Sequence, residues 1–573
     1  MNNSMSLLIG GVQGEGVIST AENLMKTLSS LGYYCFEKRN FSSRIKGGNS
    51  SIVINIGLEK KLWVEDEVSF IVALDQETID LYHPLLEENG IIFYDSTITP
   101  DPTLLKKGLK LHALPISEIA KKNGSLIMKN TSAMGFIGVL LGISEGNLIE
   151  VITKKFKKKG QDIIEKNIKV LDHVFQHANE NLNEYSNFIL NSIQKNKRPL
   201  MLGNHGVSLG ALMAGCRFVA SYPITPASEI METLGVLLPK YKGIMLQVED
   251  EIAAVNMIIG AAYGGVRSMT ATSGPGISLM MEGIGLAGMT ETPIVIVNSQ
   301  RVGPSTGMPT KHEQSDLIGL YFGGHGEYPT IILTPSTVEE CFYSTIRAFN
   351  LADKYQCPVI ILLDLTLSLS NQTIDQLDYS KIEIDRGKIF GASEIQQGYK
   401  RFQFTEDHVS TRAIPGTKGG IHHTTGLEHS EIGLPMDTPL NRKKMMEKRM
   451  EKTYILQSSN EIIIKENKPT SNNNVLVLTF GSTYGIIKGA IEKNNIPVDF
   501  GYFQMIKPLP IKQLENLFAK YDHIIVVENN YSQQLATIIR SEVGYHDKIH
   551  SVTKYDGTTF TLGEIITEIG RWV

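Results

Sequence analysis

Cysteine is scarce in this sequence, and the few cysteines that occur are scattered. The 573 residues hold only Cys35, Cys216, Cys341 and Cys357. No two of them have the CxxC spacing that zinc sites and iron–sulfur sites use. We therefore expect no metal site in this chain, and we expect any iron–sulfur cluster to belong to a partner.

An excess of positive charge is also missing. Lys and Arg number 55 against 60 for Asp and Glu, which gives a formal net charge of −5 at pH 7. Such a chain has no basic field that collects nucleic acid or an anionic membrane. Apolar stretches such as 136–143 and 359–363 are far below the roughly 18 residues of a membrane span, and residues 1–10 lack the basic start of a secretory signal. We expect a cytoplasmic protein that binds neither nucleic acid nor membrane.

Strand and helix patterns punctuated by glycine fill residues 1–195. An apolar strand at 7–9 leads through the glycine-rich turn 10–16 into a helix over 17–31, with apolar residues at helical spacing. Residues 154–197 are typical of a charged helical pair. Short apolar runs predict further strands at 51–56, 70–74 and 90–94. This part is expected to be one α/β domain on a parallel or mixed sheet.

The remaining sequence predicts two more α/β domains, so the fold class is α/β with three domains. Residues 196–370 alternate short apolar runs with helical ones such as 252–263, the pattern of a doubly wound domain. Residues 371–470 are polar and basic, and we interpret them as an extended linker with one charged helix over 441–454. Residues 471–573 again predict strand, helix and strand, a smaller domain.

The glycine turn of the first domain has two interpretations. Backbone N–H groups at a helix N-terminus stabilise anions, so residues 10–16 could cradle a phosphate. The spacing of Gly11, Gly14 and Gly16 departs from G-x-G-x-x-G, and Glu15 between them would repel a pyrophosphate. A tight turn without a ligand is equally open. No G-x-x-x-x-G-K-[ST] sequence occurs, which excludes a P-loop NTPase.

Four polar or glycine-rich turns follow predicted strands in the second domain. They are YPITP (222–226), EDE (249–251), TATSGPG (270–276) and SQRVGPSTG (299–307). In the first, two prolines fix the backbone around Thr225 and hold its hydroxyl group at a strand end. In the second, a carboxyl group meets the apolar start of a helix, where it could donate or share a proton, although an acidic first helical turn alone is ordinary. Open α/β sheets bind ligands where the carboxyl ends of their strands meet, so the four turns together predict one site.

With these motifs, residues 203–365 resemble the α subunit of the 2-oxoacid:ferredoxin oxidoreductases. The resemblance also rests on GMTETP (288–293), QRVGPSTGMPT (300–310), KHEQ (311–314) and HGE (325–327). The first 195 residues, with GGVQG (10–14) and RIKGG (44–48), are similar to the family's γ subunit, here fused ahead of α. The segments TFGS (479–482) and VENNY (527–531) resemble its transketolase-C-like domain.

The resemblance implies an enzyme that carries out CoA-dependent oxidative decarboxylation of a 2-oxoacid on thiamine diphosphate, with electrons passing to ferredoxin. It implies that Glu251 is the catalytic glutamate that hydrogen-bonds the aminopyrimidine ring of that cofactor. The cofactor-binding positions that it implies are Glu251, Thr225, Ser273 and Gly274. The substrate-binding positions that it implies are Thr225, Arg301 and Lys311.

Half of the thiamine signature is absent from the chain. The diphosphate–Mg²⁺ motif of thiamine enzymes begins with Gly-Asp-Gly, whereas the only Asp-Gly pair here, Asp556-Gly557, follows Tyr555. In the family the β subunit carries that motif, Mg²⁺ and a 4Fe-4S cluster. The resemblance therefore implies that thiamine diphosphate is shared with a β partner, that CoA is a co-substrate, and that ferredoxin takes the electrons.

The sequence leaves the substrate and one loop undecided. The cations Arg301, Lys311 and His312 favour 2-oxoglutarate, because its second carboxylate would pair with them. Lys311 lacks the guanidinium fork that some relatives have, so pyruvate or a branched-chain 2-oxoacid is the alternative. A non-catalytic Rossmann-like scaffold is the alternative class, although it has no need of a carboxyl group at a strand-end crevice. The family often has a stretch similar to GGIHHTTGLEH (419–429), so the resemblance implies an ordered loop near the active site or the subunit interface, without an assigned role. Its histidines lack the i, i+4 spacing of a helical zinc site.

Overall fold

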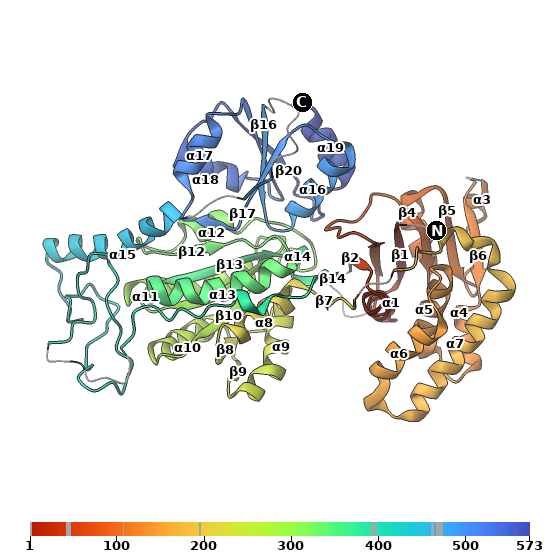
Figure 1. Cartoon of the computed structure of the whole chain (residues 1–573), viewed down its shortest axis with the longest axis horizontal. Helices are drawn as coiled ribbons and strands as arrows, with labels where there is room; N and C mark the ends of the chain where they lie inside the picture. The colour runs from red at the N-terminus through yellow and green to blue at the C-terminus, as the bar shows by residue number, and fades with distance from the viewer. Residues whose placement is uncertain are drawn as a thin grey trace. The chain divides into compact units, whose positions relative to one another are not determined.

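The computed structural model describes residues 3–41, 47–106, 108–193, 196–390, 395, 398–459, 463–465 and 474–573. These residues form two compact units (Figure 1). The first comprises Met1–Met201, Ser370–Gln376 and Thr561–Gly563, and the second comprises Leu202–Leu369, Leu377–Phe560 and Glu564–Val573. Among the helices of the described ranges, none is both long enough and apolar enough to cross a membrane.

The first unit is built on an eight-stranded mixed sheet in the order β6-β5-β4-β1-β3-β2-β14-β7. Its central strand β1 (Ser4–Val12) pairs antiparallel with β3 (Asn49–Gly57) and parallel with β4 (Val68–Ala73). The other strands are β2 (Tyr34–Asn40), β5 (Leu86–Asp95), β6 (Lys110–Leu114), β7 (Leu200–Met201) and β14 (Gln372–Thr373). The four strands predicted for this region are confirmed, with ends that differ by a few residues.

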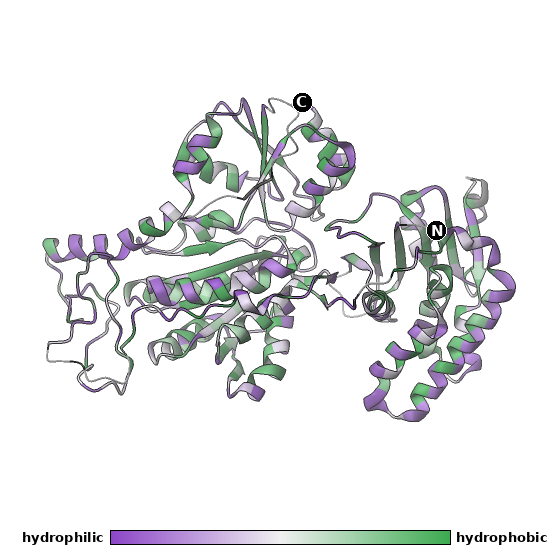
Figure 2. Cartoon of the chain, in the orientation of Figure 1, coloured by the Kyte–Doolittle hydropathy of each residue, from purple (hydrophilic) through white to green (hydrophobic). Residues whose placement is uncertain are grey.

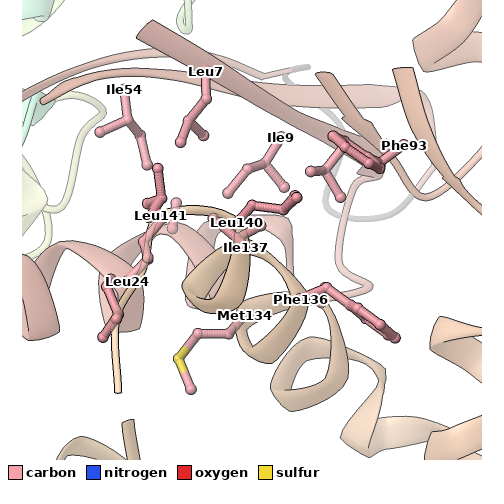
Figure 3. Close-up of a cluster of buried hydrophobic side chains, with 14 of the residues drawn as sticks. Leu7, Ile9, Leu24, Ile54, Phe93, Met134, Phe136, Ile137, Leu140 and Leu141 are labelled. Atoms are coloured by element: carbon pink, nitrogen blue, oxygen red, sulfur yellow. The ribbon is translucent and has the colours of Figure 1, made fainter. Parts of the chain in front are cut away.

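Helix α1 (Val17–Leu31) has the predicted bounds, between Gly16 and Gly32, which both adopt the left-handed conformation. The charged helical pair predicted over 154–197 is displaced toward the N-terminus: the two helices are α6 (Glu145–Phe156) and α7 (Gln161–Asn181), so only α7 lies within the predicted range. Apolar residues of β1 and β5 pack on α5 (Lys129–Leu140), as Figure 3 shows for Leu7, Ile9, Phe93 and Ile137. The remaining helices of this unit are α2 (Gln76–Tyr82), α3 (Pro102–Lys106) and α4 (Ile116–Lys122).

The second unit contains a seven-stranded sheet in the order β18-β12-β13-β11-β10-β8-β9. All neighbouring strands are parallel except the β12–β18 pair. The central strands β11 and β13 are buried throughout, and Figure 2 shows this sheet as hydrophobic. The strands are β8 (Phe218–Ser221), β9 (Ile244–Gln247), β10 (Ser268–Thr272), β11 (Ile294–Gln300), β12 (Ile331–Leu333), β13 (Pro358–Asp364) and β18 (Met505–Lys507). The predicted doubly wound arrangement is confirmed.

Helices cover this sheet, and a smaller sheet follows it in the chain. The helices are α8 (Gly203–Met213), α9 (Ser228–Leu237), α10 (Glu251–Tyr263), α11 (Gly274–Met289), α12 (Leu317–Phe322), α13 (Val338–Tyr355) and α14 (Leu365–Leu369). The five-stranded sheet consists of β15 (Ile463–Lys465), β17 (Asp499–Phe503), β16 (Val475–Phe480), β19 (His523–Glu528) and β20 (Ile549–Thr553), in that order. It packs with α16 (Thr483–Asn494), α17 (Ile511–Phe518), α18 (Gln534–Val543) and α19 (Leu562–Gly570). One hydrophobic core joins both sheets, because Ile332 and Phe503 belong to the same cluster.

The polar stretch between these sheets is attached through buried charges. It ends in α15 (Pro439–Ser459), which confirms the predicted charged helix. On α15, Lys448 Nζ lies 2.7 Å from Glu291 Oε1 and Lys452 Nζ lies 3.1 Å from Glu291 Oε2, and all three side chains are almost completely buried. Arg401 Nη2 also donates to the Glu291 carbonyl, at 2.8 Å. Glu291 thus holds cations from two separate parts of the stretch, the two lysines of α15 through its carboxylate and Arg401 through its backbone carbonyl. The four-part division of the chain at 195, 370 and 470 stays a prediction.

We expect Glu291→Gln to lower the free energy of unfolding by about 3–5 kcal/mol, because it leaves Lys448 and Lys452 buried without their carboxylate. Burial alone would raise the pKa of Glu291, but the two lysines hold it well below its ordinary value of 4.5. The stability that this group contributes is therefore present above that pH and lost as the pH falls. Lys448→Met is the matched control. It keeps the ion pair between Lys452 and Glu291, so its free energy of unfolding should fall by less. Denaturation curves at neutral and acidic pH measure the free energy of unfolding of both variants and its pH dependence. An equal loss of stability for Glu291→Gln and Lys448→Met would contradict the prediction.

Candidate active site

The four predicted turns lie at one edge of the seven-stranded sheet. Strands β8, β9, β10 and β11 run parallel to one another, so their carboxyl ends share that edge. Thr225 follows β8, Glu251 follows β9, Ser273 follows β10 and Arg301 follows β11. The prediction that these turns gather at one sheet edge is confirmed.

Glu251 is the first residue of α10, and only 6% of it is exposed. The preceding residue, Asp250, caps the helix, because its carboxylate accepts a hydrogen bond from the Ala253 N–H at 2.7 Å. The cap therefore does not use the carboxyl group of Glu251. That group turns inward, against the first turn of α11.

Glycine at position 276 makes this approach possible. A Cβ atom on Gly276 would lie 2.5 Å from Glu251 Oε1 and would also overlap Thr272 Oγ1. Real Cβ atoms essentially never make contacts under 3.0 Å, so a side chain at this position would displace the carboxyl group. The TSGPG turn is thus a cradle that only glycine leaves open.

Ser273 and Gly274 form the N-terminal end of α11, beside the cradle. Ser273 is completely buried, and its hydroxyl group has no hydrogen-bond partner among the described residues. A Cβ atom on Gly274 would lie 2.9 Å from Asp316 Oδ1, so the Asp316 carboxyl group touches this helix end. Burial raises the pKa of Asp316, although Asn298 donates to its Oδ2 at 2.8 Å. The edge therefore contains a second carboxyl group besides Glu251, that of the half-buried Asp316.

Arg301 joins the first turn to the fourth. Its Nη1 donates to the Thr225 carbonyl at 2.6 Å, and its Nη2 donates to the Thr306 carbonyl at 3.3 Å. Its Nε has no partner in the described part of the chain. Burial lowers the pKa of Arg301, and the charge of Asp316 opposes that effect. The guanidinium group is held in place beside Thr225 with donor capacity left over.

Lys311 lies on the same loop as Arg301. The Lys311 carbonyl accepts a hydrogen bond from the Val302 N–H at 3.1 Å, and its own N–H donates to the Met308 carbonyl at 3.0 Å. A Cβ atom on Gly557 would lie 3.2 Å from Lys311 Cβ, so the side chain packs on the loop after β20. Burial lowers the pKa of Lys311, which is half-buried. Two cations are thus carried by one folded loop at the sheet edge.

The structure brings Glu251 into contact with the TSGPG turn and Arg301 into contact with Thr225. The sequence did not predict that Asp316 and its hydrogen-bond partner Asn298 belong to this site. An Asp before an apolar run is ordinarily a helix cap, and nothing local shows that the Asp316 carboxylate turns away from its own helix. Residues 44–46 of the RIKGG motif lie outside the described residues. Among the residues that the structure describes, no three His, Cys, Asp or Glu side chains form a metal-ligand group.

Two family models match the chain. The model described as "Pyruvate ferredoxin/flavodoxin oxidoreductase" matches residues 6–177. The model described as "Pyruvate flavodoxin/ferredoxin oxidoreductase, thiamine diP-bdg", a thiamine diphosphate-binding domain, matches residues 209–448. The first match falls in the region whose motifs resemble the γ subunit, and the second covers most of the α-like region 203–365 and continues to residue 448.

Individual proteins are similar over the whole chain. The 2-oxoacid:ferredoxin oxidoreductase subunit alpha of Sulfolobus sp is 35% identical over 98% of this chain and 96% of its own length. The 2-oxoglutarate synthase subunit KorA of Methanothermobacter marburgensis is 37% identical over 64% of this chain and 97% of its own. A solved structure, 2-oxoglutarate:ferredoxin oxidoreductase from Magnetococcus marinus with 2-oxoglutarate, coenzyme A and succinyl-CoA bound, has a TM-score of 0.92 and 34% identity, and covers 100% of both chains.

The fold and these similarities define an oxidoreductase subunit with a thiamine diphosphate-binding domain. More specifically, the chain belongs to the 2-oxoacid:ferredoxin oxidoreductase α-subunit family.

Gly276→Ala should lower kcat of the assembled enzyme by about 10²-fold while the chain still folds, because the new methyl group displaces the Glu251 carboxyl group. Gly285→Ala on the same helix is the matched control, since its Cβ atom would meet Tyr328 at an ordinary 3.6 Å. Steady-state kinetics and thermal denaturation of both variants give the comparison. Normal turnover by the Gly276 variant would show that the position of Glu251 is unimportant.

Proposed function

We propose that this chain supplies the aminopyrimidine half of a thiamine diphosphate site in a CoA-dependent 2-oxoacid:ferredoxin oxidoreductase. The buried Glu251 carboxyl group beside the glycine cradle is the observation that carries the proposal. The surroundings fit the cofactor, because Gly276 keeps the cradle open and the Ser273 hydroxyl group is buried with no hydrogen-bond partner in the described ranges. Thr225 and Gly274 complete the proposed cofactor contacts.

The chemistry divides between the cofactor and this chain. Bound thiamine diphosphate supplies the electron sink that loss of CO₂ from a 2-oxoacid needs. Glu251 hydrogen-bonds a ring nitrogen and moves a proton at that atom, a task for which a positioned carboxyl group is suited. Thr225, Arg301 and Lys311 bind and orient the substrate, and CoA receives the acyl group.

The exposed side chains of α10 are evidence that a partner subunit binds beside this site. Between Ile252 and Tyr263 the helix has no charged residue. Its outer face exposes 50% of Ile252, 44% of Met257 and 37% of Tyr263. Asn256 is the one polar side chain exposed between Ile252 and Tyr263. Large apolar side chains exposed together on an uncharged helix mark an interaction surface, so we infer that a partner covers this face next to Glu251.

We assign the missing groups to that partner. The chain has no Gly-Asp-Gly motif, and its four buried cysteines have no CxxC spacing. The β partner accordingly holds Mg²⁺, the diphosphate end of the cofactor and the 4Fe-4S cluster, and ferredoxin accepts the electrons. Within this chain we propose a γ-type domain at 1–195, a pyrimidine-binding domain at 196–370, a linker at 371–470 and a transketolase-C-like domain at 471–573.

The proposed substrate is 2-oxoglutarate, which the enzyme converts to succinyl-CoA. The support is the pair of cations on one loop, Arg301 and Lys311, because a second carboxylate on the substrate needs a second cation. Two similar proteins also carry 2-oxoglutarate in their names. Pyruvate or a branched-chain 2-oxoacid is the second candidate, because a lysine does not provide the bidentate fork of an arginine. An assay of the complex over a panel of 2-oxoacids, with CoA and a viologen dye, tests the proposal, and this chain without its partner should be inactive.

Glu251→Gln should lower kcat of the reconstituted complex by about 10²–10⁴-fold, because an amide keeps the size of the side chain but cannot move a proton. Assembly with the partner should be unchanged. Glu249→Gln is the matched control, since Glu249 is exposed and lies in the same turn. If the Glu251 variant keeps near-normal kcat and the Glu249 variant does not, the proton transfer belongs to Glu249.

Lys311→Ala should raise KM for 2-oxoglutarate far more than KM for 2-oxobutyrate, which has no distal carboxylate. The loss of one charged hydrogen bond is worth about 1.5–3 kcal/mol, or roughly a tenfold to hundredfold change in kcat/KM. Lys311→Arg, which keeps the charge, is the control. Equal losses for both substrates would place Lys311 on the carboxylate that all 2-oxoacids share and would remove the reason to prefer 2-oxoglutarate.

A further inference from the structure

Three motifs whose residues, Lys311 apart, have no role in the proposed function meet in the second unit. They are KHEQ (311–314), TFGS (479–482) and VENNY (527–531). The side chain of Gln314 is completely buried between them. Its Nε2 donates to the Phe480 carbonyl at 3.2 Å, and its Oε1 accepts from the Asn529 N–H at 3.1 Å. One amide group therefore joins the loop that carries Lys311 to the ends of β16 and β19.

Asn529, the first residue after β19, makes contacts in two directions, and only 1% of it is exposed. Its backbone holds Gln314 a second time, because its carbonyl accepts the Gln314 N–H at 2.6 Å. Its side chain has other partners. The Oδ1 atom accepts from Thr483 Oγ1 at 3.1 Å, and the Nδ2 atom donates to the Thr558 carbonyl at 3.3 Å. The backbone of Asn529 thus fixes one loop and its side chain fixes another.

The second loop is a tight turn over residues 556–558, after β20. Both the N–H and the hydroxyl group of Thr558 donate to Asp556 Oδ1, at 2.9 and 2.7 Å, which closes the turn. Gly557 occupies its centre with a positive φ of 82°. A Cβ atom on Gly557 would lie 3.2 Å from Lys311 Cβ and 3.6 Å from Lys311 Cγ. The turn is therefore the surface on which the Lys311 side chain packs.

Lys311 is held from two sides, and both lead to Asn529. The backbone of Asn529 fixes the loop at Gln314, three residues after Lys311. The side chain of Asn529 fixes the 556–558 turn beneath the stem of Lys311. A lysine carries a point charge on a flexible four-carbon stem, so the place of its ammonium group depends on the surface under that stem. The position of the Lys311 charge thus depends on the hydrogen bond from Asn529 Nδ2.

We propose that Asn529 is a positioning residue for substrate selection. Its side chain fixes the 556–558 turn, and the turn sets where the Lys311 ammonium group meets the distal carboxylate of the substrate. The inference rests on the proposed function, because that function assigns Lys311 to this carboxylate. Asn529 acts through Lys311 and takes no part in the chemistry. A purely structural role is the competing explanation, and it predicts equal effects on all 2-oxoacids.

The test is Asn529→Ala in the full-length chain, assembled with its partner subunit. The backbone groups that hold Gln314 remain in this variant, so the chain should fold. We expect the ratio of kcat/KM for 2-oxoglutarate to kcat/KM for 2-oxobutyrate to fall about threefold to tenfold, as for the loss of one neutral hydrogen bond. The change should appear in KM for 2-oxoglutarate, with kcat nearly unchanged.

A second variant and a control make the comparison specific. Asn529→Asp keeps the size of the side chain and the acceptor for Thr483, but it cannot donate to the Thr558 carbonyl, so it should shift the ratio in the same direction. Asn494→Ala is the matched control, because Asn494 is exposed at the end of α16. Its ratio should equal that of the wild type. Thermal denaturation of each variant measures the accompanying change in stability.

A double variant tests whether Asn529 acts through Lys311. In the Lys311→Ala background the ammonium group is absent, so Asn529→Ala should not change the substrate ratio any further. The ratio of the double variant should therefore equal that of Lys311→Ala alone. If the two effects multiply instead, Asn529 acts elsewhere and the inference is overturned.

The remaining outcomes separate this inference from the proposed function. If the assembled wild-type enzyme oxidises no 2-oxoacid, the proposed function fails. If it is active and both Asn529 variants keep the wild-type substrate ratio, the positioning role is refuted while the proposed function stands. If they lower kcat/KM equally for both substrates, the role of Asn529 is structural, and the inference is again overturned.

Discussion

The close packing of α10 on α11 is the constraint on which the site depends. Two glycines of α11 face α10: Gly276 admits the carboxyl group of Glu251, and Gly283 would place a Cβ atom 2.6 Å from Val255 Cγ1. Side chains at these two positions would separate the helices. Both helices start at the carboxyl edge of the sheet, so their separation also sets the distance between Glu251 and the TSGPG turn. The position of the carboxyl group is therefore a result of helix packing.

Local patterns predicted the parts of this structure that local forces determine. The bounds of α1 followed from the glycines at its two ends and its apolar spacing, and the four turns followed from apolar runs that end in polar or glycine-rich segments. Their meeting at one edge needed only the rule that crossovers make parallel strands. The residues of β14 were assigned to the linker, because a strand of two residues has no periodicity to detect.

Contacts between distant segments could not be predicted in this way. Glu291 lies in the GMTETP motif, and Lys448 is 157 residues further along the chain. Each looks like an ordinary surface charge in its own segment, and only the tertiary fold shows that they are buried together. The contact of Asp316 with Gly274 is of the same kind. Removing charges from water is costly, so a buried ion pair such as Glu291 with Lys448 is weak evidence for stability. We interpret its role as fixing the position of α15.

Helix α10 connects the two regions that these contacts organise. It carries Glu251 at its first turn and Tyr263 at its last, and thirteen residues span about 20 Å. Under the proposed function, a partner subunit that covers the exposed apolar residues Ile252 and Met257 of this helix would also close the open side of the site beside Glu251. Closure excludes water, which strengthens every charge interaction of the buried carboxyl group. Under that proposal, partner binding and catalysis depend on the same helix, because the chain itself has no Gly-Asp-Gly motif for the diphosphate half of the cofactor.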